Sequence, residues 1–116
     1  MNPRRILVID DNQDLADGLS ELMELHLHEV DVVLTGGDGV RAAESKPYDI
    51  IFVDIGLPDI NGVECARRIK ESGSDGKIVL MTGYSAQDIP AQIKDLDDTE
   101  LLTKPIDPAL ILERIN

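Results

Sequence analysis

The chain has little cysteine, few basic residues and no long apolar run. Its one cysteine, Cys65, permits no internal disulfide and fits a reducing compartment. The 11 Lys and Arg residues stand against 23 Asp and Glu residues, and the formal charge of −12 opposes direct binding to nucleic acid or to an anionic membrane. Proteins and cations are therefore the expected partners. No apolar run approaches the ~18 residues of a membrane-spanning helix and no cleavable leader is recognisable, so a soluble cytoplasmic protein is predicted.

Internal repeats, linkers and low-complexity segments are also absent. The 116 residues fall within the usual size of one domain, so a single domain over residues 1–116 is predicted. Hydrophobic residues make up 42% of the chain and charged residues 29%, which is ordinary globular usage and argues against a largely disordered chain.

Short apolar runs alternate with segments of helical period, the pattern of βαβ units around a parallel sheet. The runs at residues 6–9, 50–53 and 78–81 lack polar alternation, as strands buried on both faces do. Weaker runs at 31–35 and 101–103 are expected to be the edge strands. Apolar residues recur at helical spacing between the strands, at Leu15, Leu19, Leu22 and Met23 and at Val63, Ala66 and Ile69.

Three helix starts carry sequence signals of different strength. Asn61 with Glu64 three residues on is typical of a capping box, and Asp107-Pro108 offers an N-cap followed by a first-turn proline. The glycine-rich residues 36–39, by contrast, are a poor helix start.

The fourth helix contains Pro90, which lacks a donor and crowds a carbonyl inside a helix. We therefore predict that this helix starts late, with Asp88 as its cap, and runs over residues 89–96.

Polar side chains follow four of the apolar runs. Asp10 and Asp11 follow the first, Asp54 follows the run at 50–53, Thr82 follows the run at 78–81, and Lys104 follows Leu101-Leu102. If those runs are strands of one parallel sheet, the five side chains lie along its carboxyl edge, where open α/β sheets bind ligands. Each residue alone is weak evidence, but the ordered combination is hard to obtain by chance.

This combination predicts magnesium-dependent phosphoryl chemistry. Adjacent carboxylates repel one another unless a hard cation joins them, and Mg²⁺ prefers such oxygen ligands together with water and a phosphate. Asp54 can then be the nucleophile that attacks a phosphoryl group, while Lys104 and Thr82 supply the ammonium and the hydroxyl that stabilise its charge. His26 and His28 are expected to be solvated, or paired with the helix dipole, on the C-terminal turn of the first helix rather than to be ligands.

The chain resembles the receiver domain of two-component response regulators over nearly its whole length. The motifs that carry the resemblance are Val8-Ile9-Asp10-Asp11-Asn12, Val53-Asp54-Ile55-Gly56-Leu57-Pro58-Asp59-Ile60-Asn61-Gly62, Met81-Thr82-Gly83 and Thr103-Lys104-Pro105. The resemblance implies a doubly wound, flavodoxin-like α/β fold with a five-stranded parallel sheet in the order 2-1-3-4-5 and helices on both faces.

The resemblance also implies roles for the site residues. Asp54 would accept phosphate from a histidine kinase or phosphotransfer protein, making the domain a signalling element that is not an enzyme beyond its own phosphorylation and dephosphorylation. Mg²⁺ would be held by Asp11, Asp54 and the Gly56 carbonyl, with Asp10 assisting through water, and Thr82 and Lys104 would hold phosphoryl oxygens. The Lys104-Pro105 bond would be cis.

One position departs from the family pattern, and a second lies where the family varies the side chain. Leu101 stands three residues before Lys104, where the family usually has an aromatic residue that moves on phosphorylation. Tyr84, two residues after Thr82, stands beside the phosphoryl position, and we hypothesise that it controls water access and hence the lifetime of the phosphoaspartate.

Several alternatives remain open at the level of sequence. A magnesium-dependent phosphohydrolase also uses an aspartyl nucleophile, although an Asp-x-Asp pair and a cap insertion are expected there. A nucleotide-binding module of the same topology would need a glycine-rich phosphate loop, which is absent. A receiver-like module that is never phosphorylated is a third alternative.

The chain is expected to be a stand-alone receiver, a terminal receiver of a sensor kinase or an excised domain. Output is expected through the fourth helix, fifth strand and fifth helix.

Overall fold

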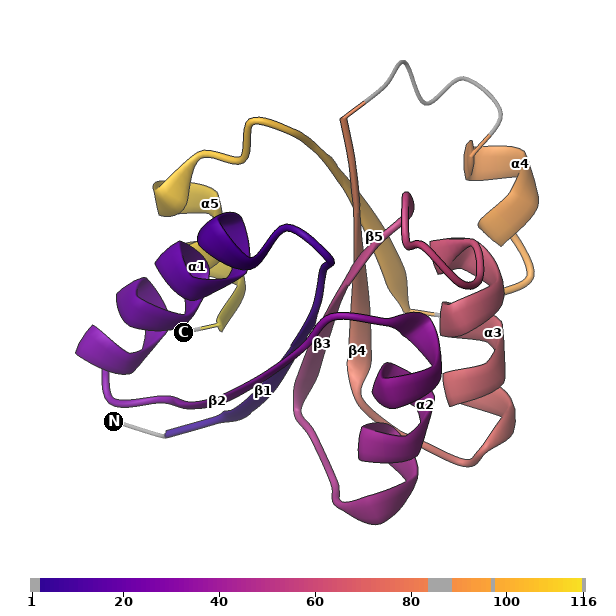
Figure 1. The fold of residues 1–116 in the computed structure, drawn as a ribbon, viewed down its shortest axis with the longest axis horizontal. Coiled ribbons are helices and arrows are strands. Elements are labelled where there is room, and N and C mark those ends of the chain that lie inside the picture. The colour runs from indigo at the N-terminus through magenta and orange to yellow at the C-terminus, as the bar shows by residue number, and fades with distance from the viewer. Residues whose placement is uncertain (1–2, 84–88, 97, 116) are drawn as a thin grey trace.

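The computed structural model describes residues 3–83, 89–96 and 98–115, which form one five-stranded parallel sheet flanked by helices (Figure 1). The sheet order is β2-β1-β3-β4-β5, as predicted, and every neighbouring pair is parallel. The strands are β1 (Arg5–Ile9), β2 (Glu29–Val33), β3 (Ile50–Asp54), β4 (Lys77–Thr82) and β5 (Thr99–Thr103).

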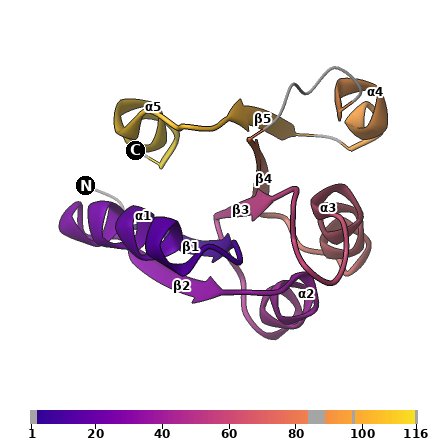
Figure 2. The same cartoon turned by 45° about the horizontal axis from the view of Figure 1, so that its top comes forward.

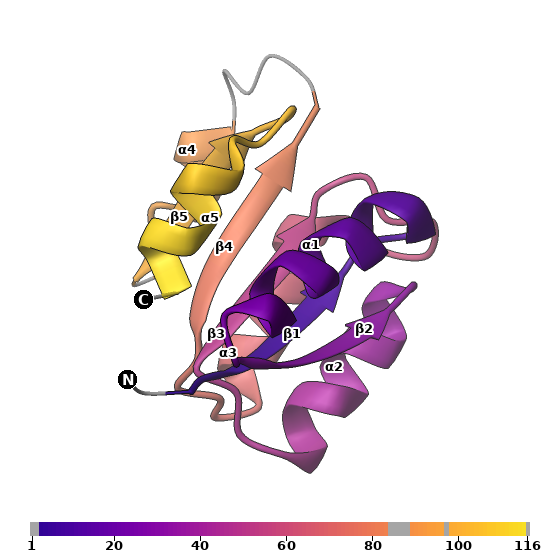
Figure 3. The same cartoon turned by 90° about the vertical axis from the view of Figure 1, so that its left-hand side faces the viewer.

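Helices cover both faces of the sheet, which confirms the doubly wound class (Figure 2). They are α1 (Gln13–Leu25), α2 (Gly36–Ser45), α3 (Gly62–Glu71), α4 (Ile89–Ile93) and α5 (Pro108–Ile115). The helices α1 and α5 pack side by side on one face (Figure 3), whereas α2, α3 and α4 lie on the other. None of the helices within the described residues is both long enough and apolar enough to cross a membrane.

Each central strand contributes to two hydrophobic cores. Ile6 and Val8 of β1 point into the core under α1 and α5, while Leu7 and Ile9 point into the core under α2 and α3. All four side chains are fully buried. Because successive side chains of a strand leave on opposite faces, a strand covered on both faces needs apolar residues at every position. The lack of alternation in the sequence therefore has a direct structural cause.

The edge strands begin earlier in the chain than predicted. The strand β2 spans Glu29–Val33 instead of residues 31–35, because Arg5 pairs in register with Glu29. Thr35 has left the sheet and caps α2, where its Oγ1 accepts a hydrogen bond from the Asp38 N–H at 3.1 Å. The strand β5 begins at Thr99, two residues before the predicted start.

The predicted helix starts are largely confirmed. Asn61 caps α3 by accepting from the Val63 N–H at 2.7 Å, while Glu64 pairs with Arg68 instead of completing the capping box. Asp107 accepts from the Ala109 N–H at 2.9 Å in front of Pro108, the first residue of α5.

The helix α4 begins at Ile89, as predicted, but ends at Ile93 rather than at Leu96. Its predicted cap Asp88 and the neighbouring Tyr84 lie outside the described residues. Arg67 of α3 ties the end of α4 to the body of the domain, donating to the Asp95 carboxylate at 2.5 Å and to a backbone carbonyl of Gln92 at 3.1 Å.

The expectation that His28 is solvated is wrong. Helix α1 ends at Leu25, and after a turn with a positive φ at Leu27 the chain brings His28 to the start of β2. There the imidazole is buried, and its Nδ1 accepts a hydrogen bond from the Arg4 N–H at 3.0 Å. His26, the C-cap residue of α1, is exposed as expected.

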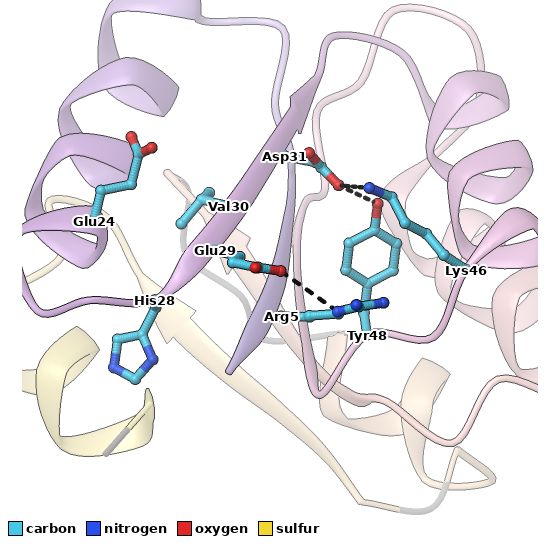
Figure 4. Close-up of a pocket in the computed structure, with 8 residues that line it drawn as sticks. All are labelled: Arg5, Glu24, His28, Glu29, Val30, Asp31, Lys46 and Tyr48. Carbon is cyan, nitrogen blue, oxygen red and sulfur yellow. Dashed lines mark hydrogen bonds and ion pairs between the residues drawn. The ribbon is translucent and has the colours of Figure 1, made fainter. Parts of the chain in front are cut away.

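A group of charged side chains fastens the edge strand β2 to its neighbours (Figure 4). Asp31 accepts from the Lys46 ammonium at 2.8 Å and from the Tyr48 hydroxyl at 2.6 Å, and Glu29 pairs with Arg5 at 3.4 Å. We call these five residues the edge cluster. Its two carboxylates and two cations balance one another, so its role is to join β2 to β1 and to the segment between α2 and β3.

Candidate metal-binding site at the carboxyl edge of the sheet

Four strands deliver polar side chains to one edge of the sheet. Asp10 directly follows β1, Asp54 is the last residue of β3, Thr82 is the last residue of β4, and Lys104 directly follows β5. The four strands are consecutive in the order β1-β3-β4-β5 and all run in the same direction. The parallel topology therefore brings together residues that are up to 94 positions apart in the chain.

A surface pocket of about 490 Å³ lies at this edge. The predicted site residues Asp11, Asp54, Gly56, Thr82 and Lys104 line it, joined by Asn12 and Gly83. Asn12 was not predicted as a site residue, although its position after the acidic pair and before a helical segment is a recognisable cap signal. Its side chain accepts from the Leu15 N–H at 3.2 Å and so starts α1 at the rim of the pocket.

Three carboxylates converge here. Asp10, Asp11 and Asp54 offer oxygens that all lie within 4.8 Å of one another, and we call these residues the acidic cluster. Asp10 is fully buried, Asp54 is 8% exposed and Asp11 is exposed, so the cluster runs from the interior to the surface. Carboxylate oxygens at this spacing are the ligands that hard divalent cations such as Mg²⁺ take, and the exposed Asp11 leaves the cluster open to solution.

Lys104 is the cation nearest to the acidic cluster among the pairs that the structure describes. Its Nζ lies 3.2 Å from Asp10 Oδ2 and 3.4 Å from Asp54 Oδ1. The Lys104-Pro105 peptide bond is cis, as the family resemblance implies, and the Lys104 N–H donates to the Thr82 carbonyl at 2.7 Å. The Lys104 ammonium thus contacts two of the three carboxylates, and three negative charges against this one positive charge leave the acidic cluster with an excess of negative charge.

The same surroundings shift the pKa of Asp54. Burial raises the pKa of the Asp54 carboxyl above its ordinary value, and the charge of Asp10 raises it further. The Lys104 ammonium and the Gly56 N–H, which lies 3.3 Å from Asp54 Oδ1, lower the pKa but do not compensate. The ionised form of Asp54 is therefore held in the fold at a cost that a bound cation would relieve.

Asp10 makes more hydrogen bonds to the protein than the sequence predicted. Its Oδ1 accepts from the Asn12 N–H at 3.0 Å and its Oδ2 accepts from Lys104 at 3.2 Å. Its own N–H donates to the Val33 carbonyl at 3.1 Å, across to the neighbouring strand. Both carboxylate oxygens are thus bonded to protein groups, so Asp10 positions Lys104 as well as contributing charge.

The turn after β3 brings α3 close behind Asp54. The Gly62 N–H donates to the Ile55 carbonyl at 2.9 Å, which closes the loop of residues 55–61 at its base. A Cβ at position 62 would lie 2.3 Å from the Asp54 carbonyl oxygen, so only glycine permits this approach.

Cys65 takes no part in the site. It is fully buried on α3, and burial raises the pKa of its thiol to about 12, with the nearby Asp59 charge adding to the effect. The thiol therefore stays protonated at neutral pH and behaves as a small apolar residue.

The arrangement places three carboxylates that could hold a metal ion, an ammonium and a buried hydroxyl around one open pocket. Phosphoryl transfer requires little covalent chemistry from a protein beyond positioning and charge stabilisation, and these are the groups that supply both.

Comparison with known proteins identifies the family. The family model described as response regulator receiver domain matches residues 6–116. The protein PilH of Pseudomonas aeruginosa is 30% identical over 114 residues, which cover 97% of this chain and 94% of PilH. A CheY-like receiver domain protein from Methanospirillum hungatei has a similar structure, with a TM-score of 0.91, 26% identity and coverage of 98% of this chain and 91% of that one.

A response regulator from Burkholderia pseudomallei, solved with a phosphorylated aspartic acid, a calcium ion and citrate, matches at a TM-score of 0.86 and 26% identity, covering 97% of this chain and 66% of that chain. Several other curated relatives are longer proteins, of which this chain spans half or less. The family match decides between the receiver and the aspartyl phosphohydrolase that the residues alone left open. The chain belongs to the response regulator receiver domain family and is a signalling domain of the two-component type.

Proposed function

We propose that Asp54 accepts a phosphoryl group from a histidine kinase or phosphotransfer protein in a reaction that requires Mg²⁺. The observation that carries this proposal is the convergence of the acidic cluster and Lys104 around the Asp54 carboxylate. Asp54 both lines the pocket and contacts the ammonium, whereas Asp11 lines the pocket but is exposed, and Asp10 contacts the ammonium but is fully buried.

The donor set fits Mg²⁺. Asp11, Asp54 and the Gly56 carbonyl would ligate the ion directly, and Asp10 would assist through water. All offer oxygen, and the negative excess of the site favours a divalent cation over a monovalent one. When bound, the ion neutralises charge on the phosphoryl oxygens and fixes their position.

The protein's own side chains supply the nucleophile and the groups that stabilise the phosphoryl charge. An Asp54 oxygen forms the new bond to phosphorus while the bond from phosphorus to the donor's imidazole nitrogen breaks, and that nitrogen keeps the electron pair. Lys104, 3.4 Å from Asp54 Oδ1, and Thr82, at the pocket wall, stabilise the charge on the phosphoryl oxygens. Water hydrolyses the resulting acyl phosphate later, so the domain catalyses only its own phosphorylation and dephosphorylation.

Relatives support this assignment. The Burkholderia response regulator carries a phosphorylated aspartic acid together with a divalent cation, and a receiver domain of DrrB, 28% identical to this chain, was solved in a BeF3-activated form. We further propose that the signal leaves through α4, β5 and α5 to a downstream protein.

Labelling with a small phosphoryl donor tests the acceptor. Acetyl phosphate or beryllofluoride is added with and without Mg²⁺ to the wild type, to Asp54→Asn and to the charge-matched control Asp75→Asn, and intact mass or NMR follows the adduct. Asp75 is exposed and lies before β4, at the opposite end of the sheet. We expect one phosphoryl group on the wild type and on Asp75→Asn in the presence of Mg²⁺, and none on Asp54→Asn.

Retained stoichiometric labelling of Asp54→Asn would move the acceptor to another residue. Absence of labelling in the wild type would instead favour a receiver-like module that acts by binding alone. A second measurement addresses the metal: since Mg²⁺ binds only the folded state, millimolar Mg²⁺ should raise the melting temperature of the wild type. An unchanged melting temperature would contradict the metal site.

A further inference from the structure

The Asp59 carboxylate bridges the loop after β3 to the start of α2. Its Oδ1 accepts from the Gly36 N–H and its Oδ2 from the Gly37 N–H, each at 2.8 Å. The two segments are more than 20 residues apart in sequence, and neither belongs to the acidic cluster. Asp59 sits in the same loop, residues 55–61, as Gly56, whose carbonyl is the proposed metal ligand.

The glycines at the start of α2 make this bridge possible. A Cβ at position 36 would lie 2.5 Å from a side-chain carbon of Ile60 and 3.3 Å from Asp59 Oδ1. A Cβ at position 37 would lie 3.3 Å from Asp59 Oδ2. Side chains at either position would therefore crowd the loop, and their absence lets the helix terminus and the loop meet.

The bridge also explains how a helix starts at such an unfavourable sequence. The first N–H groups of a helix have no partner within it. In α2 the Thr35 side chain satisfies the Asp38 N–H, while Asp59 satisfies the Gly36 and Gly37 N–H groups from outside. These two N–H groups lower the pKa of the Asp59 carboxyl, so the group is ionised at neutral pH and its charge faces the positive end of the helix.

The loop is otherwise held at its base and along one side. The Gly62 N–H bonds the Ile55 carbonyl at the base, and Leu57 and Ile60 pack partly buried against the core under α2 and α3. Gly56 itself is exposed and lines the pocket, and the contact described for its backbone is the long 3.3 Å bond to Asp54. Asp59 supplies the charged tether in the part of the loop beyond Gly56.

We infer that Asp59 is a positioning residue for Mg²⁺, fixing the loop of residues 55–61 against α2 so that the Gly56 carbonyl meets the ion already oriented. The inference rests on the proposed metal site and adds a group that does not touch the ion. Groups that orient a metal ligand through another contact commonly change metal affinity by about tenfold or more when removed. Because coupling between two sites is reciprocal, we expect Mg²⁺ binding at the acidic cluster to change the environment of the Gly36 and Gly37 amides as well.

The experiment is a Mg²⁺ titration by calorimetry and by ¹⁵N NMR on the wild type, Asp59→Ala, Asp59→Asn and Asp38→Ala. Asp38→Ala is the matched control, because Asp38 lies in the first turn of the same helix, and its side chain pairs with Arg41, whereas the Asp59 carboxylate bonds the Gly36 and Gly37 N–H groups. It removes the same charge from the same helix terminus without breaking the bridge.

We expect the Mg²⁺ dissociation constant to rise about tenfold in Asp59→Ala and to stay within about twofold of the wild type in Asp38→Ala. Asp59→Asn keeps one oxygen acceptor and should fall between them. In the wild type and in Asp38→Ala, Mg²⁺ should shift the Gly36 and Gly37 amide resonances, and in Asp59→Ala this shift should disappear while those of Asp11 and Asp54 remain.

Equal Mg²⁺ affinity in Asp59→Ala and Asp38→Ala would overturn the inference and leave the metal site standing. Failure of the wild type to bind Mg²⁺ would overturn the metal site and the inference together. If Asp59→Ala does not fold, the comparison of Asp59→Asn with Asp38→Ala decides in the same way.

Discussion

The acidic cluster and the edge cluster use the same kinds of side chain for opposite purposes. Each places aspartate next to lysine, one at the carboxyl ends of the strands and the other beside the edge strand β2. In the edge cluster two carboxylates face two cations, whereas the acidic cluster has three carboxylates and contacts one ammonium. The ratio of charges, more than the identity of the residues, separates a structural ion-pair network from a site that could hold a further cation.

The two clusters perturb their carboxylates in opposite directions. Hydrogen bonds from Lys46 and Tyr48 lower the pKa of Asp31, against a smaller effect of burial. Burial and the charge of Asp10 raise the pKa of Asp54 despite its contact with Lys104. A raised pKa, which favours the neutral form, is the feature expected of a functional carboxylate that lines an open pocket.

Solvent exposure separates the clusters as well. The Lys46 and Asp31 side chains are 50% and 45% exposed, whereas Lys104 is 21% exposed and Asp10 is fully buried. An exposed pair contributes little to stability, but removing one member of a buried pair leaves a charge without a partner.

The largest expected effect comes from removing the two lysines in turn. Lys104→Met should destabilise the fold by about 3 kcal/mol, because it leaves the buried Asp10 charge without its ammonium. Lys46→Met should cost about 0.5 kcal/mol. Urea unfolding measures both, and millimolar Mg²⁺ should restore part of the loss in Lys104→Met only, since the ion takes over the role of the cation. Equal losses for the two variants would mean that the two clusters do not differ in the way proposed.

Substituting one aspartate in each cluster should change stability in opposite directions. Without Mg²⁺ at neutral pH, Asp54→Asn should stabilise the fold by about 1 kcal/mol, because the ionised wild-type group is held at a cost. Asp31→Asn should destabilise it by about 0.5 kcal/mol, a value kept small because the pair is nearly half exposed.

The pH dependence of these two effects also differs in sign. The pKa of Asp54 is higher in the folded than in the unfolded state. Its contribution to folding stability is therefore full at a pH below the unfolded-state pKa and is lost as the pH rises through the folded-state pKa. The pKa of Asp31 is lower in the folded than in the unfolded state. Its contribution to folding stability is therefore present at a pH above the unfolded-state pKa and is lost as the pH falls through the folded-state pKa. Thermal unfolding of Asp54→Asn and Asp31→Asn should therefore give melting temperatures that approach that of the wild type as the pH falls from neutral to acid. A difference from the wild type that stays the same at every pH, in either variant, would contradict the direction given for that aspartate's pKa.

Tyr48→Phe should change stability as little as the Lys46 and Asp31 substitutions do. It removes the hydroxyl that donates to Asp31 at 2.6 Å and leaves Lys46 in place, so the loss should be about 0.5 kcal/mol. The response of the melting temperature to Mg²⁺ should match that of the wild type. A changed Mg²⁺ response would show that the edge cluster and the acidic cluster are coupled.

The sequence by itself determined the class of fold, the sheet order through its family resemblance, and most of the residues that line the pocket. Strands buried on both faces require uninterrupted apolar runs, so the positions of β1, β3 and β4 were legible to within a residue at each end. Because parallel strands end at a common edge, the polar residues after those runs had to meet, and Asp54, Thr82 and Lys104 line one pocket.

Only the tertiary structure decided which polar groups pair across distant segments. Nothing local distinguishes Asp59 from any loop aspartate until α2 is placed beside it, and the burial of His28 depends on a turn after α1 that brings it against Arg4. The same holds for the direct contact of Lys104 with Asp10 and for the three-way contact of Asp31, Lys46 and Tyr48. The physical reason is that a periodic pattern of apolar residues fixes which face of an element is buried, whereas a hydrogen bond or an ion pair depends on atoms placed to within an ångström by the packing of the whole domain.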